Sequence, residues 1–205
     1  IISATLGMFN IEYLKKLYKV SRNEFILAMF TALSVITIGV LKAVILAIGI
    51  TLIRLLAKSS KPHDEILGLV EGTNRYHDIK EYSESKEIPG ILIYRFESSL
   101  LFYNADYFKS RIDEEISKRK ANIKFLILDA SSINKIDITA SDTIDGLIDE
   151  LSKEGIEFSI TKIQREEHSI LNKSGVLKKI GNENIFDSVH LAVDSCLKKE
   201  KAVSV

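Results

Sequence analysis

Hydrophobic residues in the middle of the chain change from the spacing of a strand to that of a helix. The run Phe125–Leu128 is fully apolar and ends in Asp129. Four large apolar residues in a row predict a strand buried on both faces, as in a sheet covered by helices. From Ile144 to Leu151 the apolar residues recur every three or four positions, which predicts an amphipathic helix.

The start of this helix is the candidate functional site. Asp137 or Thr139 can act as the N-cap, and Ser141 adds a hydroxyl in the first turn. The N–H groups and dipole at a helix start can hold an anion or a partner's carboxylate. Two interpretations stay open: a docking or switching surface made by Asp137, Thr139 and Ser141, and plain helix capping, which is the simpler one.

Strand and helix patterns alternate on both sides of this stretch. Strands are predicted at 66–70, 91–96, 100–103 and 158–163, with a shorter one near 76–82, and helices are predicted at 105–118, at 165–173 and after Asp187, which caps the last helix. This alternation predicts an α/β layer with parallel central strands. We expect the region from about Leu67 to Leu197 to fold alone.

The N-terminal part of the chain is apolar in a way that suits a membrane. Phe25–Ile53 contains one charged residue, Lys42. A single helix of roughly 33 residues would be about 50 Å long, against a hydrocarbon core of about 30 Å, and would bury Lys42 near its middle. A hairpin that bends near Gly39–Lys42 avoids both problems. The alternative is a buried hairpin of a large soluble protein.

Basic residues outside the two apolar segments of the predicted hairpin, its two legs, favour this arrangement. They place the two flanks on the same side, as the positive-inside rule prefers, and they are Lys15, Lys16, Lys19, Arg22, Arg54, Lys58 and Lys61. Before the hairpin, Ile11–Tyr18 has one apolar face, which predicts an interfacial helix or an ordinary surface helix. Ile1–Phe9 is interpreted as the tail of an earlier span. The predicted parts are a membrane part, 1–60, and a soluble part, 61–205, joined by the polar linker Lys58–Asp64.

Composition removes several classes of function. The chain has 28 basic and 28 acidic residues, so no basic field favours nucleic acid. Its four histidines are far apart in sequence and form no recognised metal motif. Neither a phosphate-binding glycine loop nor a nucleophile elbow is present. We therefore expect no metal, no cofactor and no enzymatic activity, and the single Cys196 is interpreted as a small core residue.

Two stretches resemble a known family. The strand ending in Asp129, followed by Asp137-Ile138-Thr139-Ala140, is similar to the signature of STAS domains, which sulfate permease (SulP) anion transporters and bacterial anti-sigma-factor antagonists share. Leu92–Phe108 resembles the permease branch. The resemblance implies a mixed, partly parallel sheet backed by helices, preceded by a transmembrane helical hairpin. The soluble antagonists usually have Asp-Ser-Ser-Gly where this chain has Asp137–Ala140.

The resemblance implies the C-terminal end of a secondary-active transporter of sulfate or a related anion. The implied protein is integral to the plasma or inner membrane, with a cytoplasmic STAS domain for regulation and assembly. Its implied partners are the lipid bilayer, the rest of the transporter, a second copy and a cytoplasmic protein. The alternative is a soluble regulator switched by phosphorylation at Thr139.

Overall fold

The computed structural model describes residues 11–119 and 123–203, so Ile1–Phe9 lies outside the described residues. The chain divides into two units, Ile1–Ala57 and Lys58–Val205. The first contains the helices α2 (Ile11–Val20), α3 (Arg22–Ile38) and α4 (Val40–Ser59).

Gly39 separates α3 from α4, where the sequence predicts a bend. Its backbone angles, φ 85° and ψ 160°, lie in a region that is essentially restricted to glycine. The Arg54 side chain donates a hydrogen bond to the Asn23 carbonyl at 3.2 Å, which joins the far ends of the two helices. Lys42 lies in the first turn of α4 rather than mid-helix. The predicted bend is therefore confirmed.

Among the described residues, one helix, α4, is long and apolar enough to cross a membrane by length and composition. The first predicted leg, α3, has 17 residues, or about 25 Å at 1.5 Å per residue. It is thus shorter than a typical hydrocarbon core of about 30 Å.

The second unit is built on one mixed sheet. In the described residues seven strands take part, and the main order is β2-β1-β4-β5-β6-β7, with β3 paired to β1. The strands are β1 (Asp64–Val70), β2 (Tyr76–Asp78), β3 (Ser85–Lys86), β4 (Ile91–Phe96), β5 (Phe125–Asp129), β6 (Glu157–Thr161) and β7 (Ile185–Phe186). Strands β4 to β7 are parallel, and β1 pairs antiparallel to β4. The predicted α/β layer is confirmed.

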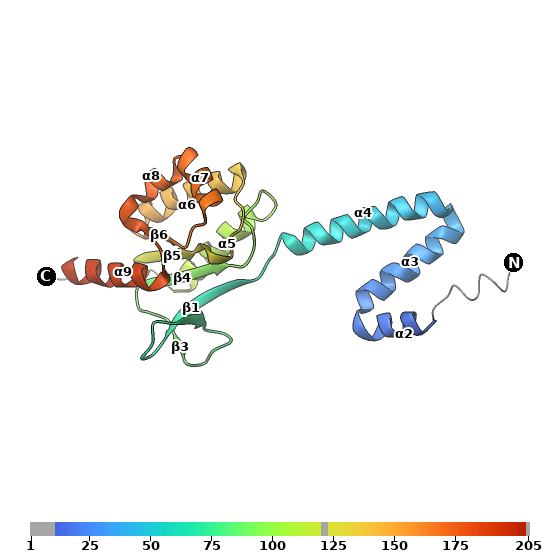
Figure 1. The fold of residues 1–205 in the computed structure, drawn as a ribbon, viewed down its shortest axis with the longest axis horizontal. Coiled ribbons are helices and arrows are strands. Elements are labelled where there is room, and N and C mark those ends of the chain that lie inside the picture. Colours follow the sequence, from blue (N-terminus) through green and yellow to red (C-terminus); the bar gives the residue numbers. More distant parts are fainter. Residues whose placement is uncertain (1–10, 120–122, 204–205) are drawn as a thin grey trace. The chain divides into compact units, whose positions relative to one another are not determined.

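Helices cover both faces of this sheet (Figure 1). One face packs against α5 (Ala105–Lys118), α6 (Ile138–Lys153), α7 (Arg165–Lys173) and α8 (Val176–Ile180), and the other against α9 (Val189–Val203). The strand β5 lies between the two layers and all five of its residues are buried. Its continuous apolar run follows from burial on both faces.

Two local predictions are wrong, and one helix was not predicted. Leu100–Tyr103 is a turn rather than a strand, because the Asn104 side chain accepts from the Leu101 N–H at 2.8 Å and donates to the Ser99 carbonyl. The last helix begins one residue later than predicted, since Ser188, not Asp187, accepts a hydrogen bond from the Leu191 N–H. Helix α8 was not predicted. It begins directly after Gly175, whose φ of +88° ends α7 and turns the chain.

Candidate functional site

Asp137 is the N-cap of α6. One carboxylate oxygen accepts from the Ala140 N–H at 2.9 Å, and the other accepts from the Phe102 N–H at 2.7 Å. The first bond satisfies a free N–H of the helix start. The second bond attaches the turn before α5 to the loop before α6. A backbone bond from the Leu100 N–H to the Lys135 carbonyl joins the same two loops. Asp137 therefore holds two loops together as well as capping the helix.

Thr139 lies on the surface of this helix start. Its side chain is exposed, and two exposed apolar side chains occur at the same end, Ile138 at 64% and Phe102 at 65%. A hydroxyl, a carboxylate and apolar groups thus share one surface, which can offer both hydrogen bonds and apolar contact to another molecule. The N-cap role predicted for Asp137 or Thr139 belongs to Asp137.

Ser141 lies inside the domain. Its side chain is fully buried, and its hydroxyl shares a 2.7 Å hydrogen bond with the Ser174 hydroxyl at the end of α7. The structure therefore places Asp137 and Thr139 at the helix start and turns Ser141 toward the packing of α6 against α7. A contact surface at this point does not include the Ser141 hydroxyl.

A row of charged side chains crosses the carboxyl ends of the central strands. Glu65 lies opposite Arg95 in the β1–β4 pairing, and Arg95 lies beside Asp129 in the β4–β5 pairing. Arg95 donates to Glu65 at 3.0 Å and to the fully buried Asp129 at 2.8 Å and 3.1 Å. Lys162 approaches Asp129 at 3.5 Å. In open sheets with parallel strands, this edge is where ligands commonly bind.

The pKa values in this row follow from burial and charge. Burial acts to raise the pKa of Asp129, but hydrogen bonds and charge from Arg95, with Lys162, hold it below its usual range. The pKa of the Glu65 carboxyl is raised, first by burial and then by the negative charge of Glu97. The two carboxylates that Arg95 joins are therefore in different electrostatic environments.

His63, Glu65 and Glu97 form a group with metal-binding chemistry. Their ligand atoms all lie within 4.8 Å of one another. This group was not predicted, because Glu97 is 32 positions from Glu65 and reaches it only through the pairing of β1 with β4. The predicted strand begins at residue 66, so the spacing His63-x-Glu65 gave no strand signal, although β1 in fact begins at Asp64.

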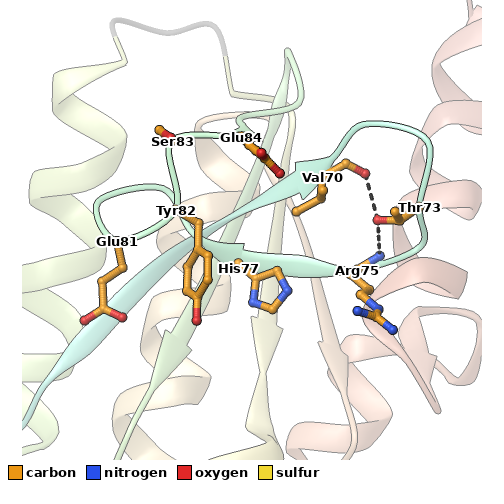
Figure 2. Close-up of a pocket in the computed structure, with 8 residues that line it drawn as sticks. All are labelled: Val70, Thr73, Arg75, His77, Glu81, Tyr82, Ser83 and Glu84. Atoms are coloured by element: carbon orange, nitrogen blue, oxygen red, sulfur yellow. Dashed lines mark hydrogen bonds between the residues drawn. The ribbon is translucent and has the colours of Figure 1, made fainter.

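A surface pocket of about 430 Å³ lies beside the β1–β2 hairpin. Figure 2 shows His77 and Tyr82 at its wall, with ring centroids 4.5 Å apart. Arg75, Glu81 and Glu84 supply charges of both signs around it. The sequence predicts a short strand near 76–82 in this region and no site. The pocket can receive a polar group. The described residues that line it do not form a nucleophile–histidine–carboxylate triad.

Comparisons with known proteins agree on one family. The STAS domain family matches residues 82–192. A "Probable sulfate transporter" of Mycobacterium tuberculosis is 31% identical over 195 residues, which cover 95% of this chain and 35% of that protein. "Sulfate transporter 4.1, chloroplastic" of Arabidopsis thaliana is 30% identical and covers 97% of this chain and 30% of its own length. The chain thus spans about a third of the curated relatives it matches.

Solved structures show the same fold. The murine solute carrier 26 family member A9 anion transporter, in its inward-facing state, matches 93% of this chain and 31% of its own, with a TM-score of 0.80 and 19% identity. A sulfate transporter family protein from Wolinella succinogenes matches 60% of this chain and 99% of its own, with a TM-score of 0.50 and 22% identity.

Proposed function

This chain belongs to the STAS domain family, and from that membership we propose that it forms the C-terminal part of a SulP-type anion transporter. In this proposal residues 1–60 end the membrane transport domain, and residues 61–205 form a cytoplasmic STAS domain. The role of the chain is regulation, assembly and partner docking rather than catalysis.

The observation that carries the proposal is the similarity to sulfate transporters on both sides of the linker. The match to the mycobacterial protein covers 95% of the chain, so it includes apolar helices that a soluble regulator does not need. Many large side chains of α3 and α4 are exposed, among them Leu33 at 62%, Ile36 at 82% and Leu41 at 75%. An exposed apolar surface of this kind favours contact with lipid or with further membrane helices.

The transported ion is proposed to be sulfate or a related anion such as bicarbonate or a dicarboxylate. Its binding site is proposed to lie in a transport domain outside this chain, where the N-termini of half-helices can hold an anion near the membrane midplane. The lipid bilayer, that transport domain and a second copy of the protein are the proposed partners.

Asp137 and Thr139 are proposed to form a docking surface for the transport domain or for a cytoplasmic protein. The support is the exposure of Thr139 next to exposed Ile138 and Phe102, on a helix start that Asp137 fixes. An added negative charge at Thr139 would stand two residues from Asp137 and would have to lose water at any contact.

Uptake of labelled sulfate by liposomes containing the full-length protein tests the transport proposal. We expect uptake that unlabelled sulfate competes with, and bicarbonate and dicarboxylate arms identify the preferred anion. Recovery of the chain in the soluble fraction without detergent, with no uptake of any of these anions, would contradict the proposal.

Cysteine labelling tests the proposed hairpin. We expect Val20→Cys and Lys58→Cys, each in a Cys196→Ala background, to react with an impermeant reagent from the same side of the membrane. The basic residues that flank both legs are the reason. Reaction from opposite sides would mean a single crossing and would exclude the hairpin.

A further inference from the structure

Two antiparallel strands bring His63, Glu65 and Glu97 to one place. Glu65 lies opposite Arg95 in the β1–β4 pairing, and the Glu97 N–H donates to the His63 carbonyl at 3.1 Å. His63 directly precedes β1, two residues before Glu65, and Glu97 directly follows β4, two residues after Arg95. The Glu97–His63 bond continues the β1–β4 register, so His63 lies opposite Glu97 and next to the Glu65–Arg95 pair.

The three ligand atoms are close enough for one cation. They lie within 4.8 Å of one another, whereas a tetrahedral ion with bonds of about 2.0–2.2 Å requires separations of about 3.3–3.6 Å. His63 and Glu97 are exposed, so small rotations of these two side chains can close the difference. One imidazole and two carboxylates form a ligand set that suits Zn²⁺ and similar first-row ions, and water can complete the coordination.

Neighbouring charged side chains orient the third ligand, Glu65. Arg95 contacts one oxygen of Glu65 at 3.0 Å, which leaves the other oxygen for a cation. Buried Asp129 in turn fixes Arg95 at 2.8 Å. Outer contacts that orient a ligand in this way are typical of metal sites.

The net charge of the row favours a cation. Glu65, Glu97 and Asp129 contribute three negative charges, while Arg95 and Lys162 contribute two positive ones. One negative charge is left over, and the carboxylates of Glu65 and Glu97 lie close together. A divalent ion there would replace their repulsion by attraction.

We propose that His63, Glu65 and Glu97 bind one divalent transition-metal ion, with Zn²⁺ as the reference ion. The site is separate from the start of α6. Its first ligand, His63, lies four residues after the end of α4. Metal binding would therefore hold the end of the linker, where His63 lies, against the residues that follow β4.

Zinc titration of the untagged full chain in detergent tests this proposal. Calorimetry should give one Zn²⁺ per chain, and the loss of one ligand should weaken binding 10-fold to 100-fold in His63→Ala and in Glu97→Gln. At the same zinc concentration, zinc should also raise the melting temperature of the parent chain more than that of either variant, because stabilisation by a ligand falls as its binding weakens.

Matched controls separate a built site from general surface binding. His168→Ala and Glu166→Gln change exposed residues of the same types on α7 and should bind zinc like the parent chain. Mg²⁺ and Ca²⁺ should compete poorly, since they prefer all-oxygen sites. Equal zinc binding by the parent and both ligand variants, or no binding at micromolar zinc, would overturn the proposal.

Discussion

At the scale of single residues, Asp137 and Thr139 have different roles at the start of α6. Its carboxylate holds the helix start and the Phe102 N–H, so a change at Asp137 disturbs the fold. Thr139 is exposed and caps nothing, so a change there alters the surface and little else. The two residues therefore test different roles.

We expect Thr139→Ala to fold and transport normally, and Thr139→Glu to fold normally but transport less at equal surface expression. The added charge suits a helix N-terminus, by about 0.3–1 kcal/mol, but it has to be desolvated at a contact. Anion uptake by the full-length transporter measures the difference. Ser152→Glu places the same charge on an exposed residue at the far end of α6 and should leave uptake unchanged. Uptake at the parent rate by both Thr139 variants would mean that Thr139 is only part of a helix start and not of a docking surface.

A second residue-scale prediction concerns acid stability and Glu115. This carboxylate is 5% exposed and pairs with Arg119 at 2.7 Å and Lys118 at 2.9 Å. Burial opposes ionisation, but Arg119 and Lys118 lower the pKa of Glu115 to about 2. A folded-state pKa below the unfolded value contributes stability above about pH 4.5, and that stability is lost as the pH falls toward 2.

We expect Glu115→Gln to lower the free energy of unfolding of residues 58–205 by about 1–3 kcal/mol at pH 7, because Arg119 and Lys118 lose the negative charge and one of the two acceptor oxygens they bind. The same change should flatten the pH dependence of stability between about pH 4.5 and 2. Urea unfolding at several pH values measures both effects. Glu114→Gln changes a side chain that is 50% exposed and should lower the free energy of unfolding less. Equal losses in the two variants would mean that burial of Glu115 does not cause the effect.

Sequence reasoning located the helix start but not every side chain in it. Asp137 is predictable because N-caps have a narrow residue preference. The inward position of Ser141 depends on Ser174, which lies 33 residues away, and no local pattern encodes that contact. The His63 group likewise forms through the pairing of β1 with β4.

At the scale of elements, two glycines predict opposite effects of the same substitution. In Gly68 of β1 a Cβ would lie 2.8 Å from the Lys86 backbone and from Ile79. In Gly146 of α6 a Cβ would meet nothing within 4 Å. Gly68 allows the Lys86 backbone and the Ile79 side chain to approach β1 closely. Gly146 has no such neighbour and only makes its helix less stable than alanine would.

We expect Gly68→Ala to destabilise residues 58–205 by about 1–3 kcal/mol through overpacking. Gly146→Ala should stabilise them by about 0.5–1 kcal/mol through helix propensity. Denaturant midpoints of the two variants give the comparison. Stabilisation by Gly68→Ala would mean that the β1–β3 contact is looser than described.

Long periodic elements were predictable, and short ones were not. The helices at 105–118 and 165–173 and the strand at 91–96 have the predicted bounds, because each shows a full period of its pattern. The turn at Leu100 resembles a strand in hydrophobicity, but the Asn104 side chain closes it. Helix α8 has five residues, which is too few to show a helical period.

At the scale of the whole molecule, the described unit Lys58–Val205 is larger than the region expected to fold alone. A chain that begins at Leu67 lacks Asp64, Glu65 and Ile66, the residues that pair with β4. It also lacks the 3.0 Å ion pair between Asp64 and Arg111. Because β1 begins at Asp64, the structure favours a boundary in the linker over one at Leu67, and independent folding of either region stays a prediction.

We expect residues 58–205 to be soluble and to melt in one cooperative transition. A chain of residues 67–205 should be less stable by at least about 1.5–3 kcal/mol, since Ile66 is almost fully buried and burial of an isoleucine contributes about that much. Thermal melts followed by circular dichroism compare the two. A chain 58–205 without a cooperative melt would show that the domain needs the apolar helices.

The outer strands of the sheet are too short to pair readily with a strand of another molecule. The order of strands ends in β2, which has three residues, and in β7, which has two. Such short edges offer few free backbone groups for another strand to join. If two copies associate as proposed, the short edges favour contact through helices and loops instead of extension of one sheet, and such a contact could form and separate without any exchange of backbone hydrogen bonds. The same short edges protect the domain from growth into fibres while it is being made.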